Sequence, residues 1–373
     1  MGYTWIQISE MLLASRWTIA RRVARYELGG LQRFTNIPDD ELRRIMVHFI
    51  NEHGNFVGFS LMYGHLKSLG LKVKQKRIKD MLRTIDPESS RLRWALVVSR
   101  RSYYVAAPNS LWHIDGHHSL VTWGFVIHGG IDGYSRLIVM LKCSTNNHSV
   151  TVGDLFCTAI ERYGIPSRVR TDHGGENVLI WQMMEEMRGM SRGSALRGTS
   201  TQNQRIERLW RDVFRCVTCT CYYLFQSMES TGLLDRNNPL HMYILHFVFK
   251  PRINKSLHSF QSAWNCHPVR TEHQWSPERM WQNGLLHLSN LNLTAVRSLL
   301  HEDLTLSEDD MVWYGFDPGA PGAQDLVDPP QVLVDDIDIE PIAGIDDIDP
   351  LRPSESMGID IFCDLLNLVN TSL

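Results

Sequence analysis

Short apolar runs bounded by turn residues are the feature of this sequence that most restricts its fold. Three such runs follow one another at 110–116, 124–132 and 136–143, and a fourth lies at 165–171. Runs of this length and composition are typical of strands, and the Asp-Gly step between the second and third is typical of a hairpin. Helical periodicity occupies 146–164, between the third and fourth runs, and returns in two segments after the fourth, 176–189 and 200–225. This order predicts an α/β fold with helices packed on a mixed sheet.

Charge divides the chain into three regions that the net charge of −3 conceals. Residues 1–105 carry 18 Lys and Arg against 9 Asp and Glu, whereas residues 106–316 carry 19 of each. Residues 317–373 carry 13 acidic residues and one Arg. A basic head and a separate acidic tail favour a polyanion such as DNA as the partner of the head, although a basic surface is also compatible with simple solvation.

Residues 1–35 are predicted to form a helix-turn-helix unit. Thr4 and Gln7 are spaced as a capping box, Ser15 can cap the next helix, and Ile19 and Val23 face inward. This leaves a polar face with the pattern of a DNA recognition helix, although an ordinary helical hairpin has the same apolar spacing. The residues predicted to contact DNA are Arg16, Thr18, Arg21 and Arg22, with Arg25 beside them.

A second helical DNA-binding unit is predicted over 36–105. Helices are expected at 38–54, 59–70 and 74–83, and the third carries the basic residues. Lys76, Arg77 and Lys79, with Lys74, are placed where a recognition helix would contact phosphates, or where a solvated helix face would be charged.

The C-terminal part differs in composition. Residues 284–316 form an extension, and 317–373 form an acidic tail rich in Asp, Pro and Gly, which is expected to be disordered. Its last segment, 358–370, alternates acids with apolar residues. That pattern is compatible with folding on a protein partner or with a solvated tail.

Several classes of protein are disfavoured. No run of about 18 apolar residues occurs, so we expect no membrane association, and the N-terminus has no secretory pattern. Seven cysteines in 373 residues do not indicate a disulfide framework and favour a reducing compartment. Cys216, Cys219 and Cys221 lack a second ligand cluster, so burial in a helix is favoured over a zinc site.

Three acids are the candidate catalytic residues. Asp115 lies within the first strand, Asp172 directly follows the fourth, and Glu207 lies in the 200–225 helix. If those strands are neighbours and the helix packs across them, three carboxylates meet at one edge of the sheet. Hard oxygen ligands favour Mg²⁺ or Mn²⁺, and two such ions can support phosphoryl transfer. Taken singly, each acid also fits a turn or a surface charge.

The local motifs resemble the DDE integrase and transposase family, whose core has a ribonuclease H-like fold. The three acids occur in the order Asp, Asp, Glu with 56 and then 34 residues between them. "NSLWHIDG", "GGIDGYSRLIV", "YGIPSRVRTDHGGEN", "STQNQRIERLWRDV" and "NCHPVRTEHQWSPERMW" each resemble a family motif. The resemblance covers about 106–283 and is closest to integrase-like proteins of animal or fungal transposable elements. The zinc-binding head of retroviral integrases is not visible.

The resemblance implies a role for each matched position. Asp115 would bridge two metal ions (Mg²⁺ or Mn²⁺), Asp172 would hold one and Glu207 the other. Asp132 would shape the hairpin and Glu176 would be structural. The helix of Glu207 also carries Arg205, Arg208 and Arg211, which would contact DNA or pair with nearby acids. His113, His117 and His118 surround Asp115 and are expected to form hydrogen bonds or face solvent, rather than bind metal.

The resulting functional prediction is metal-dependent DNA cleavage and strand transfer, as in DNA integration. The resemblance further implies a homo-oligomer, and a DNA substrate implies work in the nucleus. Two alternatives stay open: a DNA-binding protein of transposon origin that has lost catalysis, and a nuclease without strand transfer.

Overall fold

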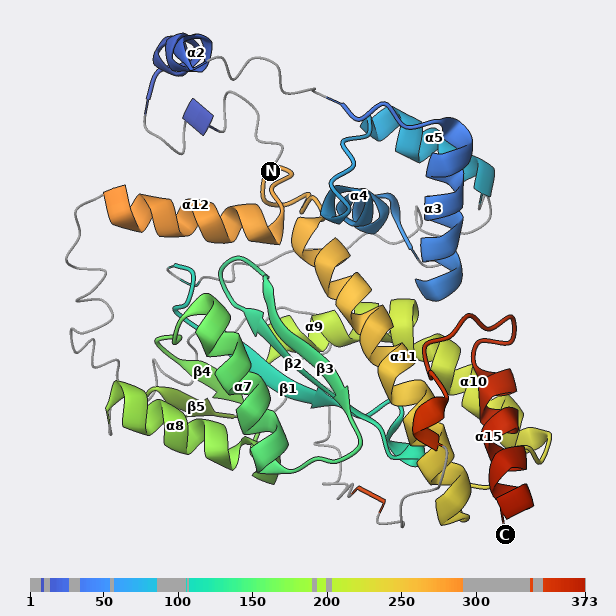
Figure 1. The fold of residues 1–373 in the computed structure, drawn as a ribbon. Coiled ribbons are helices and arrows are strands. Elements are labelled where there is room, and N and C mark those ends of the chain that lie inside the picture. The colour runs from blue at the N-terminus through green and yellow to red at the C-terminus, as the bar shows by residue number, and fades with distance from the viewer. Residues whose placement is uncertain are drawn as a thin grey trace. The chain divides into compact units, whose positions relative to one another are not determined.

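The computed structural model describes residues 8–9, 14–26, 34–53, 57–85, 105, 107–189, 193–198, 203–290, 336–337 and 345–372 (Figure 1). The chain forms two compact units. The helical unit comprises Met1–Phe49, Val57–Val97 and Ser262–Leu304; the sheet unit comprises Ile50–Phe56, Val98–Gln261 and Thr305–Leu373. Residues 262–283, which the sequence assigns to the core, thus group with the N-terminal helices. The predicted domain boundaries stay predictions.

A mixed five-stranded sheet forms the centre of the sheet unit. Its strands are β1 (Trp112–His117), β2 (Val126–Asp132), β3 (Ile138–Ser144), β4 (Val169–Thr171) and β5 (Ala195–Arg197), in the order β3-β2-β1-β4-β5. The first three strands are antiparallel, whereas β4 pairs parallel with both β1 and β5. The predicted mixed sheet and ribonuclease H-like fold class are confirmed. Strand β5 was not predicted from the sequence.

The hairpin between β2 and β3 is organised by Asp132. One of its carboxylate oxygens, Oδ2, accepts hydrogen bonds from the backbone N–H and the hydroxyl of Ser135, both at 2.7 Å. The other, Oδ1, accepts the backbone N–H of Asn109 at 3.0 Å. Arg136 adopts a left-handed backbone with φ of 63°. Asp132 therefore shapes the turn, as predicted.

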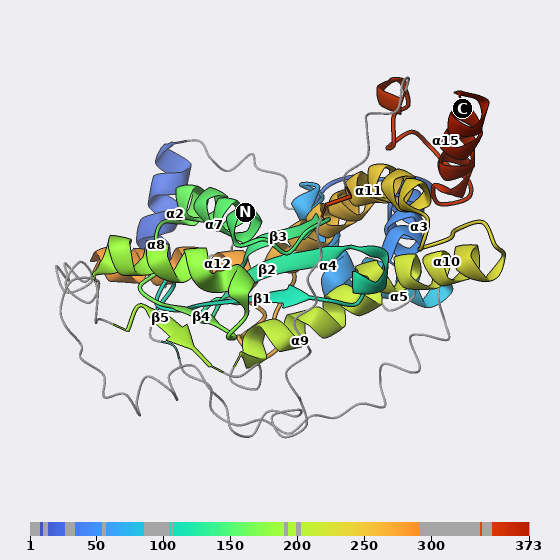
Figure 2. The same ribbon diagram turned by 90° about the horizontal axis from the view of Figure 1, so that it is seen from below.

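Helices cover both faces of the sheet (Figure 2). On one face lie α7 (Ser149–Tyr163) and α8 (Val178–Arg188), and on the other lies α9 (Gln204–Val213). Trp112 of β1 is fully buried and makes an edge-on contact with Phe156 of α7 at 5.9 Å between ring centroids. Short 3-10 helices, η3 (Val121–Trp123) and η4 (Gly175–Asn177), follow β1 and β4.

The single long helix predicted over 200–225 is wrong in detail. After α9 the chain forms a π-helix, η6 (Phe214–Thr218), and then α10 (Cys219–Ser230). Cys216, Val217 and Thr218 of this π turn are all buried. Cys216 lies in η6, and Cys219 and Cys221 lie in α10, partly buried.

The helical unit contains the two helices predicted to carry basic residues, α2 (Arg16–Arg25) and α5 (Gln75–Ile85). Its other helices are α3 (Asp39–His53) as far as Phe49, α4 (Phe59–Ser68), α11 (Pro239–Cys266) from Ser262 onward, and α12 (Pro277–Asn290). Ser15 caps α2 by accepting the Thr18 N–H at 3.2 Å, as predicted. The helix predicted before α2 lies outside the described residues, apart from 8–9. No helix in the described part of the chain is long and apolar enough to span a membrane.

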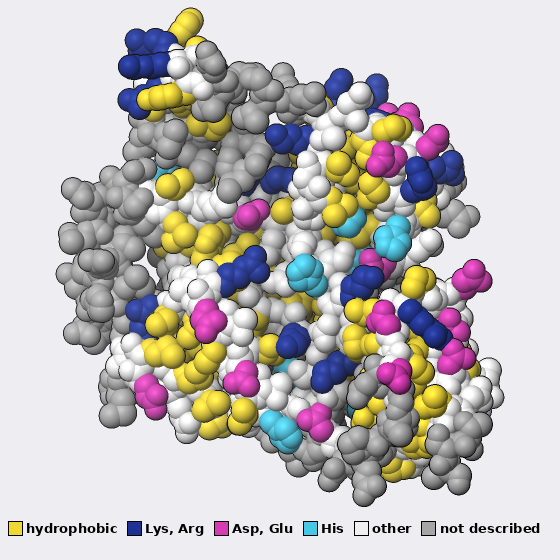
Figure 3. Space-filling view, in the orientation of Figure 1, with side chains coloured by type: hydrophobic (Ala, Val, Ile, Leu, Met, Phe, Trp, Pro, Cys, Tyr) yellow, Lys and Arg dark blue, Asp and Glu magenta, His cyan; other side chains and the backbone are white. Residues whose placement is uncertain are grey.

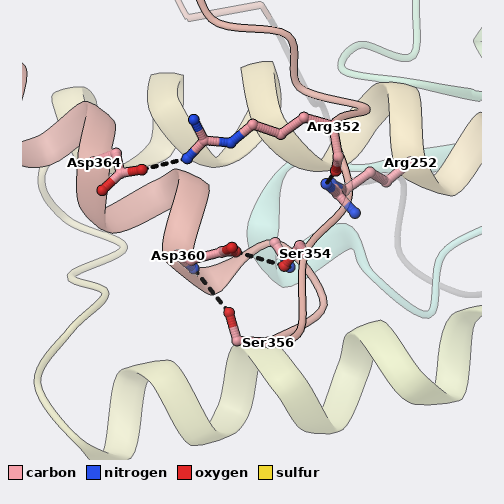
Figure 4. Close-up of polar contacts among 7 residues, drawn as sticks. Arg252, Arg352, Ser354, Ser356, Asp360 and Asp364 are labelled. Carbon is pink, nitrogen blue, oxygen red and sulfur yellow. Dashed lines mark hydrogen bonds and ion pairs between the residues drawn. The ribbon is translucent and has the colours of Figure 1, made fainter.

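The prediction of disorder is wrong for the end of the acidic tail. Residues 345–347 form the 3-10 helix η7 and Ile359–Ser372 form α15. Ile361, Phe362 and Leu365 are fully buried, because they recur at helical spacing and form one apolar face. Arg252 of α11 donates to the carbonyl of Arg352 at 2.6 Å (Figure 4). This part of the tail therefore packs within the sheet unit.

Candidate active site

The pairing of β1 with β4 positions two of the predicted acids. His113 is the parallel partner of Arg170. Asp115 and Asp172 each lie two residues after these partners, so they reach the same level of the sheet. Alternation along the strands then directs both side chains to one face. The neighbouring strands that the sequence analysis required are confirmed.

Helix α9 covers that same face of β1. Asn203, immediately before α9, holds the side chain of His113 at 2.7 Å and donates to the carbonyl of Ile114 at 2.8 Å. Glu207 follows Asn203 by four residues and therefore lies on the same side of the helix. The third predicted acid is thus brought to the edge where Asp115 and Asp172 lie.

The charges of the three carboxylates act on one another. Burial, followed by the charges of Glu207 and Asp172, raises the pKa of Asp115 well above its usual range. Burial and the charge of Asp172 raise the pKa of Glu207 to about 7. Mutual repulsion of this kind is typical of carboxylates gathered at a functional site.

Asp172 is held in place by neutral donors. Its Oδ1 accepts the Gly174 N–H at 3.1 Å and the side-chain amide of Asn177 at 2.8 Å. Glu176 lies close by: a Cβ on Gly174 would meet its carboxylate at 2.3 Å. Burial and then the charge of Asp172 raise the pKa of Glu176. The glycine thus makes room for a fourth acid beside the site.

Asp115 is held by the indole of Trp210. The Nε1–H of Trp210 donates to Asp115 Oδ2 at 2.8 Å. This hydrogen bond and one from the Gly116 backbone partly oppose the rise in the pKa of Asp115. The indole therefore fixes the direction of the carboxylate without removing its preference for a proton or a cation.

The carboxylates are near one another without forming a closed cluster. Among the described residues, no three His, Cys, Asp or Glu side chains lie close enough together to hold a metal ion as they stand. What the structure brings together is a set of oxygen donors that influence one another through space.

Burial lowers the pKa of each of the three histidines around Asp115. Burial and the charge of Arg170 lower the pKa of His113 to about 3. Burial and the charge of His118 lower the pKa of His117 to about 4, and its ring stacks on Trp210 at 5.1 Å. Burial also lowers the pKa of His118, against the charge of Asp172. His113 contacts Asn203 and His117 stacks on Trp210, so both histidines stabilise the structure around the acids.

The basic side chains of α2 stand together on one helix. Arg16, Arg21, Arg22 and Arg25 are exposed, whereas Thr18 is partly buried and bonded to Ser15. Figure 3 shows the dark blue side chains of this helix grouped at the upper left. Their arrangement suits contact with phosphates, and that role stays a prediction.

The residues predicted to bind DNA on α5 differ in their surroundings. Lys76 is exposed, but Arg77 donates to Asp39 at 2.7 Å and to the carbonyl of Ile37 at 2.6 Å, and Lys79 lies 4.7 Å from the Phe59 ring. An open groove of about 530 Å³ between α3 and α5 is lined by both signs of charge; among its residues are Asp39, Asp40, Asp80, Lys74 and Lys76. Arg77 thus ties α5 to the start of α3, which leaves less of it for a ligand.

The three arginines of α9 are not equivalent. Arg208 and Arg211 are exposed, but Arg205 is partly buried and its charge acts on Asp132 and His113. Arg205 therefore faces the hairpin side of the sheet unit more than it faces solvent.

Sequence reasoning did not single out Asn203, Trp210, Asn177 or Gly129. A usable signal was present, because Asn203, Glu207 and Trp210 are spaced i−4, i and i+3 and must share one helix face. For Gly129 there was no local signal: its importance comes from pairing with Asp115 across the hairpin.

One comparison with known protein families finds a match. The model of the integrase core domain matches residues 102–295, just over half of the chain. No curated protein sequence matches significantly.

Solved structures with some similarity include a magnesium complex of the integrase catalytic core of the virus HTLV-2 in its trimeric form. It has 15% identity and a TM-score of 0.30, covering 48% of this chain and 99% of that one. The simian T-cell lymphotropic virus intasome with the PP2A regulatory subunit B56 gamma has 13% identity and a TM-score of 0.35, covering 64% and 72%. With a five-stranded mixed sheet and a family model matching more than half of its length, the chain belongs to the integrase core domain family.

Proposed function

We propose that this protein is a metal-dependent DNA strand transferase of the integrase type. Asp115, Asp172 and Glu207 are the catalytic residues in this proposal. The observation that carries it is the placement of these acids: the pairing of β1 with β4 brings Asp115 and Asp172 to one level of the sheet, and Asn203 fixes the start of the helix that carries Glu207 against β1. Such an arrangement costs stability unless cations neutralise it.

The donor set suits Mg²⁺ or Mn²⁺. All three side chains offer carboxylate oxygens, which are the ligands that these hard ions prefer. In the proposal Asp115, Asp172 and Glu207 would hold the ions. When bound, the ions would supply Lewis-acid stabilisation of the attacking and leaving oxygens of a phosphodiester.

The residues of the chain supply position and orientation. Asp172 is kept in one orientation by Asn177 and the Gly174 N–H, and α9 is fixed to β1 by Asn203. A rigid set of ligands on a sheet edge and a helix favours one geometry for the reacting phosphate.

Basic side chains would bind the DNA backbone. We assign this role to Arg16, Arg21 and Arg22 of α2, to Lys76 and Lys79 of α5, and to Arg208 and Arg211 of α9. Thr18, Arg77 and Arg205 are weaker candidates, because each has a partner or is partly buried. Contacts of this kind weaken as salt is added, since binding releases counterions.

The proposal is tested with the full chain, labelled DNA duplexes and Mn²⁺. Wild-type protein is expected to produce cleaved or joined strands, and Asp172→Asn is expected to remove both products. The matched control is Asp154→Asn, which removes the same charge from an exposed position on α7 and should leave the products unchanged.

Each other outcome indicates a different function. Salt-sensitive binding without any product would indicate a DNA-binding protein that has lost catalysis. Cleavage without joining would indicate a nuclease. Products that persist in Asp172→Asn would remove Asp172 from the site.

We further propose that the protein works as a homo-oligomer in the nucleus, where its DNA substrate lies. Light scattering after size-exclusion chromatography measures the first point, and a monomer at working concentration would contradict it. Fluorescence microscopy of a tagged chain measures the second, and exclusion of the tagged chain from the nucleus would contradict it.

A further inference from the structure

Trp210 is a residue at the site for which the proposed function has no role. It lies on α9, is 4% exposed, and donates its indole N–H to Oδ2 of Asp115 at 2.8 Å. We propose that Trp210 is a positioning residue that fixes the carboxylate of Asp115 for divalent ions. This inference rests on the proposed function, because it assigns Asp115 to metal binding.

The indole is itself held rigidly. Its ring stacks on His117 with 5.1 Å between ring centroids and 15° between the planes. His117 follows Asp115 by two residues, so both side chains leave the same face of β1. One flat ring therefore covers two successive positions on that face, and its N–H is directed at the carboxylate.

The neighbouring strand makes room for the ring. Gly129 of β2 is the cross-strand partner of Asp115. A Cβ at this position would lie 2.5 Å from Cη2 of Trp210. Any larger residue would push the ring away from β1, so the glycine and the tryptophan form one arrangement.

The hydrogen bond also links two of the predicted ligands. Trp210 follows Glu207 by three residues on α9, so fixing Trp210 against β1 fixes the helix that carries Glu207. A carboxylate offers about four lone-pair sites, and the indole uses one of them. The donor is neutral, so it orients Asp115 without supplying the positive charge that a cation would bring.

The same device appears at the second aspartate. Asp172 is oriented by the neutral amide of Asn177 and by a backbone N–H. Partners that orient a metal ligand through a hydrogen bond affect affinity for the metal by about 10- to 100-fold.

The test replaces the indole N–H group of Trp210. Trp210 is substituted by 3-benzothienylalanine, which keeps the shape of the ring and has sulfur in place of N–H. Isothermal titration calorimetry then measures Mn²⁺ binding to the metal-free full chain. The specific signal is the part that Asp115→Asn removes. We expect the analogue to bind Mn²⁺ about 10- to 100-fold more weakly than wild type.

A matched control uses the same analogue at Trp123. This indole is 2% exposed, and its Nε1 has no hydrogen-bond partner among the described residues. Its replacement should change Mn²⁺ affinity by less than about twofold, because no hydrogen bond is lost. Thermal unfolding of both variants checks that the fold is kept.

The outcomes separate this inference from the proposed function. Wild-type protein that binds Mn²⁺ at Asp115, with an unchanged affinity in the Trp210 analogue, would overturn the positioning role alone. Wild-type protein without specific Mn²⁺ binding would overturn both. Equal losses in the Trp210 and Trp123 analogues would attribute the effect to packing and would also overturn the positioning role.

Discussion

The carboxylates of the sheet edge and those of the C-terminal helix have opposite surroundings. At the edge, burial and neighbouring carboxylates raise the pKa of Asp115 and Glu207. At α15, burial works to raise the pKa of Asp360, but hydrogen bonds from Ser354 and Ser356 make the net shift a lowering. Asp364 forms an ion pair with Arg352 (Figure 4).

The difference separates acids that stabilise the fold from acids that cost stability. In α15 each acid named above has a donor within its own segment, so its charge is accommodated by the protein. At the sheet edge the neutral donors orient the acids but do not neutralise them. Carboxylates that are positioned at a cost to stability are the expected sign of a site that binds cations.

The largest effect is expected from removing a charge at the edge. Asp115→Asn should lower Mn²⁺-dependent DNA cleavage roughly 1,000-fold or more, since metal stabilisation of a transition state is worth several kcal/mol. Product formation from labelled duplexes measures this. Asp364→Asn removes the same charge from α15 and should retain activity. Equal losses of activity in both variants would show that acids of the sheet edge and of α15 do not differ in function.

A smaller effect is expected from the apolar face of α15. Phe362→Ala removes a fully buried ring and should destabilise the docking of the helix by about 3 kcal/mol. Hydrogen exchange of the peptides covering 359–369 should then increase, while Mn²⁺-dependent cleavage is unchanged. Unaltered exchange would show that α15 does not depend on this packing.

The pH dependence of the free energy of unfolding tests the raised pKa of Glu207 at the sheet edge. The folded pKa of Glu207, about 7, lies above its ordinary value of 4.5, so the folded state binds this proton more tightly than the unfolded state does. Protonated Glu207 therefore stabilises the folded state fully below pH 4.5, and this contribution to the free energy of unfolding is lost as the pH rises to about 7.

In metal-free buffer, thermal unfolding should show wild type losing about 2 kcal/mol relative to Glu207→Gln over this interval. Added Mn²⁺ should reduce the loss at the upper end. A difference between the two proteins that does not change with pH would contradict the raised pKa.

The smallest effect is expected at the start of α15. Ser354 donates to Asp360 at 2.5 Å and accepts the Gly358 N–H at 2.6 Å. Ser354→Ala should destabilise the helix by about 1 kcal/mol, because two partly exposed hydrogen bonds are lost. Hydrogen exchange at 358–361 measures the change. The control is Thr158→Ala, which removes a side-chain hydrogen bond from α7 and should leave exchange at 358–361 as in wild type.

Sequence patterns predicted the elements that are decided locally. Four strands and the helices over them follow from periodicity and turn residues, whereas the expectation that Asp115, Asp172 and Glu207 gather came from motif resemblance. Strand β5 was missed because three residues carry no period that can be recognised, and its existence depends on pairing with β4. The π turn was missed because its residues continue the helical periodicity of the segments on either side.

Long-range contacts decided the remainder. The hydrogen bond from Trp210 to Asp115 joins residues far apart in the chain, and the space for it comes from Gly129 on a third element. The order of α15 depends on burial of Phe362, which acidic composition does not reveal. Composition predicted a solvated tail because it averages over a segment in which the apolar residues share one face.

The parallel register of β1 and β4 also determines when the site comes into existence. Because side chains alternate between faces, a shift of one residue between these strands would direct Asp115 and Asp172 to opposite sides of the sheet. No partly folded chain with that misalignment can present the paired acids. If the protein cuts DNA as proposed, a newly synthesised molecule would therefore remain harmless to DNA until this long-range strand pairing is complete.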